Sequence, residues 1–345
     1  MSAALTLALD TMSGDHGPEA VVPAALACLR DHDDVHFILV GDQAALEACL
    51  KRHKAQVSQR LVIRHASEVV GMSEAPSKAL RTKKDSSMRV ALNLVRDGEA
   101  KSCVSAGNTG ALMATARFVL KTLPGIDRPA IISPIPSRQG HTLMLDLGAN
   151  AECSPEQLFQ FAVMGSVMAM AVHGRANPRV GLLNIGAEEI KGNQQIQSAG
   201  KLLDGSDLNY IGYVEGDDIY LGDVDVVVCD GFTGNVALKT SEGLGRLIAD
   251  FLREEFSRNP LTKAAALCAM PVLKAFRKRV DPRNYNGATF VGLQGIVIKS
   301  HGDADAVAFR SAIETAIKEL ETDVPRRISS LLASALDRPC QTGTS

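Results

Sequence analysis

The sequence predicts an α/β fold built on a mostly parallel sheet, and two observations lead to this prediction. Short apolar, β-branched runs alternate with segments of helical periodicity, which is the pattern of βα units. Many of these runs end at bends rich in Gly and Asn, and the chain contains 29 Gly. With 345 residues, 46% of them hydrophobic, the chain can bury a large core, which must be mainly aliphatic because only 4% of residues are aromatic.

The first half of the chain shows this alternation clearly. Pro18 opens the first helical segment, and Gly41-Asp42 ends the second apolar run. Ser154-Pro155-Glu156-Gln157 combines an N-cap, a first-turn proline and a capping-box glutamine, so it opens a long helix. The strands predicted here are 5–9, 35–40, 61–64, 102–105, 130–133 and 142–146. The helices predicted here are 19–30, 43–54, 86–96, 109–120 and 154 to about 173.

The second half continues the same order without a fixed-period repeat, a low-complexity linker or a clear boundary. Its predicted strands are 180–183, 210–214, 224–229, 289–291 and 295–299. Its predicted helices are 193–203, 236–256, 303–320 and 326–336. We therefore expect residues 1–336 to form a single α/β domain, and the polar tail 337–345 to be disordered.

Composition and charge exclude several classes of protein. A formal net charge of −2 gives no overall field that would attract nucleic acid. The seven Cys include no C-x-x-C pair and their number is odd, so we expect buried thiols in a reducing compartment, with neither disulfides nor a zinc site. No apolar run is long enough to span a membrane and no signal peptide is evident, so we expect a cytoplasmic protein.

Five segments rich in Gly, Asn and Thr follow predicted strands, and a sixth, 284–288, precedes one. The five segments are 10–17, 106–110, 146–150, 184–193 and 230–235. Any one of them could be an ordinary turn. Ligands of parallel sheets bind beyond the carboxyl ends of the strands, so we predict one shared site where backbone N–H groups meet an anion. The residues that we expect to bind substrate there are Asp10, Gly14, Asp15, His16, Gly107, Asn108, Thr109, Gly110, Asn150, Asn184, Gly192, Asn193, Asp230, Thr233 and Gly234.

The motifs that are absent narrow the chemistry. The chain has no P-loop, no Gly-rich dinucleotide fingerprint after a strand, no nucleophile elbow and no zincin motif. Its eight His show no metal-ligand spacing. We therefore expect no metal, no cofactor and no covalent serine mechanism.

Three side chains in these segments could act on an anion or a carbonyl group. Lys191 lies between a Gly-rich bend and a predicted helix, where an ammonium could hold phosphate or polarise a carbonyl. A solvated surface lysine is nevertheless the commoner role. Asn235 is a helix N-cap, a donor to an oxyanion, or both. His16 either donates to an anion or forms a hydrogen bond within its own loop.

The segment 244–283 is unusual in a different way. Its first part places apolar residues on one face of a helix. An apolar stretch follows, which we expect Pro271 to break, and it ends in a basic cluster. This pattern suits a dimer interface, an acidic partner or a membrane surface. It also suits an ordinary core helix with a solvated basic end.

Six long motifs lie between Leu7 and about Glu319. They are LALDTMSGDHGP, SAGNTGALMA, DLGANAECSPEQL, NIGAEEIKGN, VVVCDGFTGNVALKTSEG and NGATFVGLQGIVIKSHG. In this order they resemble the bacterial phosphate acyltransferases of phospholipid synthesis, the PlsX family. In the first motif this chain has Thr11 and Ser13 where the family more often has Ala and Gly.

The resemblance implies an enzyme that converts fatty acyl-[acyl carrier protein] and inorganic phosphate into acyl phosphate and free carrier protein. It implies a Rossmann-like α/β/α sandwich similar to phosphotransacetylases and to isocitrate and isopropylmalate dehydrogenases. It also implies a homodimer, and peripheral membrane contact through a protruding helical tip at about 261–280. By motif, the expected catalytic residues are Lys191 and Asn235.

The resemblance also indicates which residues could contact larger partners. The carrier protein is expected to be acidic, so basic side chains of the segment 244–283 are candidate contacts for it or for anionic lipid. They are Lys263, Lys274, Arg277, Lys278, Arg279 and Arg283. Contact with the downstream glycerol-3-phosphate acyltransferase is an open alternative.

The chemistry implied is acyl transfer from a thioester, in which the thiolate is a good leaving group. Lys191 would orient phosphate, and Asn235 with nearby backbone N–H groups would receive the oxyanion during direct attack. Two other classes stay open. A metal-dependent decarboxylating dehydrogenase of related fold would need an Asp cluster and a carboxylate-binding Arg, which we cannot assemble. A non-catalytic scaffold for lipid-synthesis enzymes would explain the segment 244–283 alone.

Overall fold

The computed structural model describes residues 5–336, with their side chains except those of residues 277–280, 282, 284 and 334–336. The predicted tail, 337–345, lies outside the described residues. The side chains of Arg277, Lys278 and Arg279 lie outside them as well.

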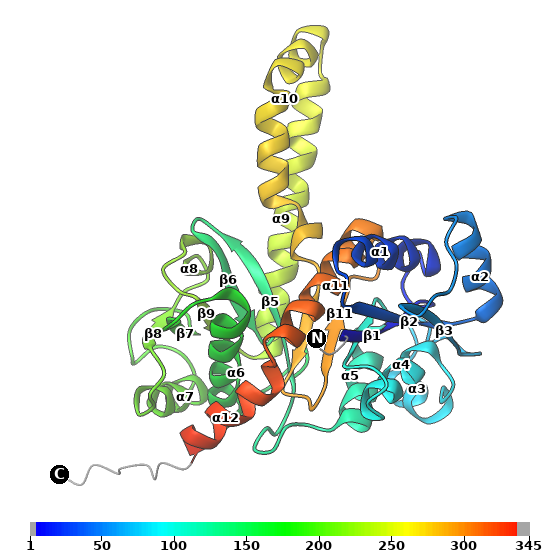
Figure 1. Ribbon diagram of the computed structural model, residues 1–345. Coiled ribbons are helices and arrows are strands. Elements are labelled where there is room, and N and C mark those ends of the chain that lie inside the picture. Colours follow the sequence, from blue (N-terminus) through cyan, green and yellow to red (C-terminus); the bar gives the residue numbers. More distant parts are fainter. Residues whose placement is uncertain (1–4, 337–345) are drawn as a thin grey trace.

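An 11-stranded mixed sheet forms the centre of the molecule, and helices cover both of its faces (Figure 1). The strand order is β3-β2-β1-β4-β11-β10-β5-β6-β9-β7-β8. Among the described strands, seven pairings are parallel and three are antiparallel, which confirms the mostly parallel sheet. The strands are β1 (Leu5–Asp10), β2 (Val35–Gly41), β3 (Leu61–His65), β4 (Ser102–Ser105), β5 (Ala130–Ser137), β6 (Gly140–Leu145), β7 (Val180–Leu183), β8 (Tyr210–Val214), β9 (Val226–Val228), β10 (Ala288–Val291) and β11 (Ile296–Lys299).

Every predicted helix is present, with shifts of up to three residues at the ends, apart from α9, which begins five residues earlier than predicted. The structure adds α3, α8 and η1, which are too short to show a helical period in the sequence. The helices are α1 (Pro18–Asp31), α2 (Gln43–Arg52), α3 (Pro76–Thr82), α4 (Ser87–Arg96), α5 (Thr109–Leu120), α6 (Pro155–His173), α7 (Gln194–Asp204), α8 (Asp218–Leu221), α9 (Gly231–Ser257), α10 (Pro260–Val280), the 3₁₀-helix η1 (Pro282–Tyr285), α11 (Ala306–Glu321) and α12 (Val324–Leu336).

The two halves of the sheet run in opposite directions. β1, β2, β3, β4 and β11 are mutually parallel along their side of the sheet. The three antiparallel pairings, β11·β10, β10·β5 and β5·β6, then reverse the direction for β6, β9, β7 and β8. The expectation that all five Gly/Asn-rich segments follow strands at the same end of the sheet is therefore wrong.

These segments instead form two groups. We call the residues that follow β1, β4 and β11, namely 10–17, 106–110 and 299–303, the β1 cluster. We call the residues that follow β6, β7 and β9, namely 146–150, 184–193 and 230–235, the β9 cluster. Within each group the strands are parallel, so their carboxyl ends share one edge.

Helices α9 and α10 form a long hairpin that projects from the body of the molecule (Figure 1). The turn between them, near residues 258–259, is the tip, so the basic residues at 274–283 lie toward the base. Pro271 does not break the segment as predicted, because α10 runs through it from Pro260 to Val280. An internal proline removes one helical hydrogen bond at a cost of about 3 kcal/mol, and packing of α10 along α9 offsets this. None of the described helices is long and apolar enough to cross a membrane.

The core is largely aliphatic, as predicted, and it includes the fully buried Phe37, Phe161, Phe290 and Phe309. Five of the cysteines, at 28, 49, 103, 153 and 229, are free and buried, which confirms the expectation for them. Cys268 is different because it lies exposed on α10.

Candidate active site

The β1 cluster is held together by close backbone approaches between three loops. The N–H of Asp15 donates to the carbonyl oxygen of Gly302 at 2.8 Å, which joins the β1 loop to the β11 loop. Gly14 has φ +80, and a Cβ on it would lie 2.9 Å from both Ala106 Cβ and Gly302 O. Only glycine fits at this position, because the backbone is left-handed and the space is filled.

Asp10 sits at the centre of this cluster as a fully buried carboxylate. Each of its oxygens accepts a hydrogen bond of 2.6 Å from a hydroxyl, one from Ser87 and one from Ser105. These hydroxyl bonds satisfy a buried acceptor that would otherwise be costly. Asp10 is therefore a structural residue of the cluster, and the sequence expectation that it binds substrate gains no direct support from its contacts.

Sequence reasoning missed Lys299, the last residue of β11. Its side chain is partly buried, and its ammonium donates to the carbonyl oxygens of Ser300 and, at 3.5 Å, Ala106. Burial, together with the charge of Lys239, lowers the pKa of Lys299 to about 8. The signal was present in the sequence, since Lys299 follows an apolar run and precedes Ser300-His301-Gly302, but a single lysine at a strand end is common on protein surfaces.

Asp146 organises the β9 cluster. Its buried carboxylate accepts hydrogen bonds from the backbone N–H of Ile131 (2.9 Å), Ala149 (3.1 Å) and Asn150 (2.7 Å). The Asn150 side chain also donates to it at 2.9 Å. Burial raises the pKa of the Asp146 carboxyl, and these hydrogen bonds act in the opposite direction. Asp146 thus fixes the loop after β6.

Helix α9 begins earlier than predicted, and this changes the role of Asn235. Asp230 is the N-cap, and its side chain accepts bonds of 2.8 Å from both the N–H and the hydroxyl of Thr233. Asn235 therefore lies inside the helix, so its interpretation as an N-cap is wrong. Its side chain is exposed beside Gly148, where a Cβ would lie 3.6 Å from Asn235 Oδ1. With no hydrogen bond to any described residue, the amide is available to a ligand.

Lys191 lies in the loop that follows β7, the strand next to β9. Its ammonium forms an ion pair of 2.8 Å with Glu188, and this hydrogen bond raises the pKa of Lys191. The Asn184 side chain holds the loop by donating to the carbonyl oxygens of Gly186 (3.1 Å) and Lys191 (3.2 Å). Lys191 and Asn235 thus follow neighbouring parallel strands, each with an exposed polar end.

Several other predicted substrate-binding residues have structural roles. Asn108 caps α5 through Ala111 N (3.0 Å) and donates to the carbonyl of Met72 (2.7 Å). Asn193 caps α7 through Ile196 N at 2.9 Å. His16 is exposed, and its ring makes no hydrogen bond to the described part of the chain, so the second reading of His16, a bond within its loop, gains no support. Of the remaining residues of this prediction, Gly107 and Gly192 lie in the bends after β4 and β7. Thr109 and Gly110 lie in the first turn of α5, and Gly234 lies in the first turn of α9.

Helix α9 connects the two clusters. It starts in the β9 cluster at Asp230, and one turn beyond Asn235 it carries Lys239, whose charge acts on Lys299. Further along, Glu242 Oε1 lies 3.9 Å from His301 Nε2 in the β1 cluster. The β1 cluster and the β9 cluster therefore both lie beside α9.

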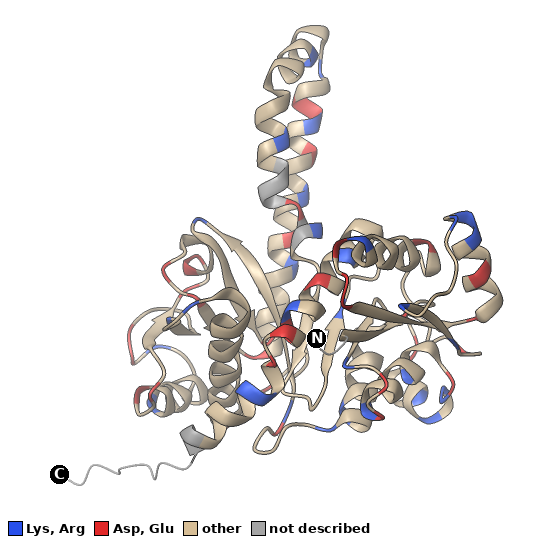
Figure 2. Cartoon of the chain, in the orientation of Figure 1, with Lys and Arg blue, Asp and Glu red and all other residues tan. Residues whose placement is uncertain are grey.

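The predicted basic contacts differ in their surroundings. Lys263 and Lys274 are exposed on α10. Arg283 instead forms ion pairs with Asp281 (2.7 Å) and Asp305 (3.2 Å), and the hydrogen bonds to these carboxylates raise the pKa of Arg283. Figure 2 shows basic and acidic residues interspersed along the hairpin, so the drawn charges do not form one uniformly basic face.

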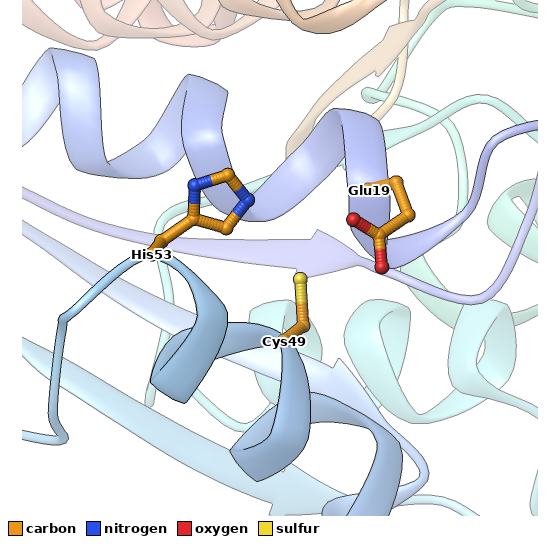
Figure 3. Close-up of side chains that lie close together, drawn as sticks. All are labelled: Glu19, Cys49 and His53. Carbon is orange, nitrogen blue, oxygen red and sulfur yellow. The ribbon is translucent and has the colours of Figure 1, made fainter.

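One group of side chains in the described part of the chain could hold a metal ion, although the sequence predicted none. Ligand atoms of Glu19, Cys49 and His53 lie within 4.8 Å of one another (Figure 3). Arg52 already forms an ion pair with Glu19. Burial raises the pKa of the Cys49 thiol, which disfavours the thiolate that a metal would bind. These contacts favour a structural role for the group.

Comparisons with known proteins agree on the family and on the fold. Residues 5–327 match a family described as "Fatty acid synthesis protein". The chain is 61% identical over 336 residues to a phosphate acyltransferase of Alkalilimnicola ehrlichii, covering 97% of this chain and 98% of that protein. It is 60% identical over 323 residues to a phosphate acyltransferase of Methylococcus capsulatus, covering 94% and 95%. A phosphotransacetylase structure from Streptococcus pyogenes has a TM-score of 0.62 at 18% identity, covering 92% of this chain and 94% of that chain. This last likeness concerns the fold, and it confirms the predicted similarity to phosphotransacetylases.

Proposed function

The chain belongs to the fatty acid synthesis protein family and is a phosphate acyltransferase, and from this premise we propose that its substrates are fatty acyl-[acyl carrier protein] and inorganic phosphate. The products would be acyl phosphate and free carrier protein, in an early step of phospholipid synthesis. The observation that carries the proposed site is the pair of exposed polar groups, Lys191 Nζ and Asn235 Nδ2, after the neighbouring strands β7 and β9.

The proposed reaction is a direct attack. An oxygen of phosphate adds to the thioester carbonyl, and the C–S bond then breaks as the thiolate leaves with the electron pair. Lys191 binds and orients phosphate through its positive charge. The Asn235 amide donates to the oxyanion of the tetrahedral intermediate, and it is free to do so because Asp230 supplies the cap of α9.

Apolar side chains beside these two groups support a fatty acyl substrate. Ile185 and Ile190 flank the loop of Lys191 and are 78% and 88% exposed. Phe232 and Val236 lie next to Asn235 on α9 and are also exposed. Large apolar side chains exposed together mark a binding surface. We propose that they contact the acyl chain near its reacting carbonyl.

The hairpin is the proposed region for larger partners. Its exposed apolar residues support a homodimer and peripheral contact with a membrane surface. Lys263 and Lys274 are candidate contacts for an acidic carrier protein or for anionic lipid. A contact with the glycerol-3-phosphate acyltransferase that consumes acyl phosphate would use the same projecting element.

The test is formation of acyl phosphate, trapped with hydroxylamine, from acyl carrier thioester and inorganic phosphate. We expect Asn235→Ala to lower kcat about 10²- to 10³-fold, which is the loss typical of one oxyanion donor. Lys191→Ala is expected to raise the KM for phosphate as well as lower kcat, because it removes a charge that orients this substrate.

Lys201→Ala is the matched control, since Lys201 is an exposed lysine on α7 away from the proposed site. Its kinetic constants should equal those of the unaltered protein. Near-normal turnover in both Lys191→Ala and Asn235→Ala would overturn the assignment of these residues, while leaving the acyl transfer itself in place.

A further inference from the structure

We propose that Lys299 Nζ and Ser13 Oγ bind a phosphate group in the β1 cluster, an inference that rests on the proposed function. The proposed reaction involves two phosphate-bearing ligands, inorganic phosphate and the phosphopantetheine arm of the carrier protein. Both present anionic oxygens that accept hydrogen bonds from an ammonium and a hydroxyl. The site adds to Lys191 and Asn235, which lie in the β9 cluster.

Lys299 carries a positive charge without a counter-ion. Among the described residues its ammonium contacts carbonyl oxygens, of Ala106 and Ser300, and forms no ion pair with a carboxylate. The charge of Asp10 does act on it, but both Asp10 oxygens already accept hydrogen bonds from serine hydroxyls. A partly buried charge is unfavourable unless it is paired. A bound phosphate would supply the missing counter-ion.

Ser13 provides an independent observation that points to a ligand. Its side chain is buried, with 3% of the residue exposed, and its hydroxyl has no hydrogen-bond partner. Buried hydroxyls nearly always have a partner, so this group is an exception that calls for an explanation. The hydroxyl lies 2.9 Å from where a Cβ on Gly107 would be, next to Ala106, whose carbonyl oxygen Lys299 contacts.

The surroundings of the two groups suit a small anion. Gly14 and Gly107 allow the loops after β1, β4 and β11 to approach one another closely, since a Cβ on either glycine would collide with neighbouring protein atoms at 2.5–2.9 Å. Lys239 on α9, whose ammonium forms an ion pair of 2.9 Å with Glu242, brings a second positive charge close enough to act on Lys299. Asp303 and Asp10 oppose these charges. Two lysine charges that repel each other are held more favourably when an anion binds near both.

The competing explanation is that Lys299 only balances the buried charge of Asp10. That explanation leaves the Ser13 hydroxyl without a role, and it predicts no response of Lys299 to phosphate. The two explanations therefore differ in a property that is measurable on the unaltered protein.

The first experiment measures reductive methylation of individual lysines in the full chain, by peptide mass spectrometry. Inorganic phosphate and phosphopantetheine are the two probes, compared with chloride at equal ionic strength. We expect one or both probes to slow methylation of Lys299 about tenfold and to leave Lys201 unchanged. The probe that protects identifies the source of the phosphate group. Equal methylation of Lys299 with and without both probes would overturn the proposal.

The second experiment measures equilibrium binding of the same probes to variants. Lys299→Met should weaken binding of the protecting probe about tenfold, Ser13→Gly should weaken it by a smaller factor, and Lys201→Met should not change it. Unchanged affinity in a folded Lys299→Met variant would contradict the proposal, whatever happens to its thermal stability. If Lys299→Met does not fold, Ser13→Gly and the methylation experiment still decide the question.

Neither experiment requires turnover, so the phosphate site in the β1 cluster and the proposed acyl transfer can be rejected separately. Absence of acyl hydroxamate with the unaltered protein would reject the proposed function. Protection of Lys299 under that result would still establish a phosphate site in the β1 cluster.

Discussion

Glu319 on α11 is a buried acid that the proposed chemistry does not use. Its carboxyl group is fully buried, it accepts a hydrogen bond from the Thr289 hydroxyl, and its second oxygen has no partner. Burial raises the pKa of Glu319 from the ordinary 4.5 to about 8. The folded protein therefore holds a proton at neutral pH that the unfolded chain releases.

This difference predicts how stability depends on pH. A pKa that is higher in the folded state stabilises the protein below about pH 4.5, and this contribution is lost as the pH rises through about 8. Glu319→Gln carries no titrating group at this position. We compare the free energy of unfolding of Glu319→Gln with that of the unaltered protein at the same pH. We expect the variant's value minus the unaltered protein's value to increase by more than about 1 kcal/mol from pH 5 to pH 9.

Urea unfolding of both proteins at pH 5, 7 and 9 measures this effect. A constant difference across the three pH values would show that Glu319 ionises in place without penalty. Asp223→Asn, which replaces an exposed acidic side chain before β9, serves as the control for loss of a carboxylate at the surface.

Single residues also show the limit of sequence reasoning. The order of strand, turn and helix around Asn235 was predicted correctly. Its helix was predicted to start at Val236, however, so the capping role was given to the wrong side chain. The N-cap is Asp230, because only two residues, Cys229 and Asp230, separate the end of β9 from the start of α9 at Gly231. Lys299 was not found, since its lack of a counter-ion depends on loops that lie far away in the sequence.

At the scale of elements, the first turn of α9 is fixed against the end of β6. A Cβ on Gly234 would lie 1.9 Å from the carbonyl oxygen of Asp146 and 2.9 Å from Cys229 Sγ. Gly243, farther along the same helix, has no neighbour within 4 Å of such a Cβ. The two glycines therefore form a natural pair for comparison.

We expect opposite effects from alanine at these two positions. Gly234→Ala forces α9 away from Asp146 and should destabilise the protein by about 1–3 kcal/mol, the range for overpacking, with loss of turnover because Asn235 moves with the helix. Gly243→Ala should stabilise it by about 0.5–1 kcal/mol, because alanine favours helix. Chemical denaturation measures both, and equal stabilities of the two variants would refute the tight contact.

Elements of ordinary length were predicted well, because their apolar periodicity is local information. Helix α3 was missed because its 7 residues contain one buried side chain, Ala79. Helix α10 was expected to break at Pro271, yet it continues. Support from α9 is a tertiary contact, and no local pattern reveals it.

At the scale of the whole molecule, the reversal of strand direction could not be read from the sequence. Strands β10 and β11 come late in the chain but insert beside β4 and β5, near the middle of the sheet. Pairing of distant segments depends on the complete set of strands. The sequence therefore placed each of the five Gly/Asn-rich segments after a strand correctly, and it misjudged their division into two clusters.

The hairpin gives a prediction about association of the whole molecule. Leu261 and Leu267 on α10 are 80% and 71% exposed, and burying one such side chain contributes about 1.5–3 kcal/mol. Leu261→Ser combined with Leu267→Ser should lower the fraction of protein that floats with anionic lipid vesicles by about tenfold. Acyl transfer to phosphate in solution should be unchanged.

Val57→Ser removes an exposed apolar side chain outside the hairpin and should float normally. Sedimentation of the same variants reports on the homodimer. Normal flotation of the double variant would place any lipid contact away from this part of α10.

Helix α9 has 27 residues, and Asn235 lies in its second turn. The 22 residues from there to Ser257 span roughly 33 Å at the rise of an α-helix. A stiff helix of this length fixes the distance between Asn235 and the tip of the hairpin. If the far end of this helix rests on a lipid surface, the reacting carbonyl lies tens of ångströms above that surface. The hydrophobic acyl phosphate then has to travel this distance before a membrane-bound enzyme can use it.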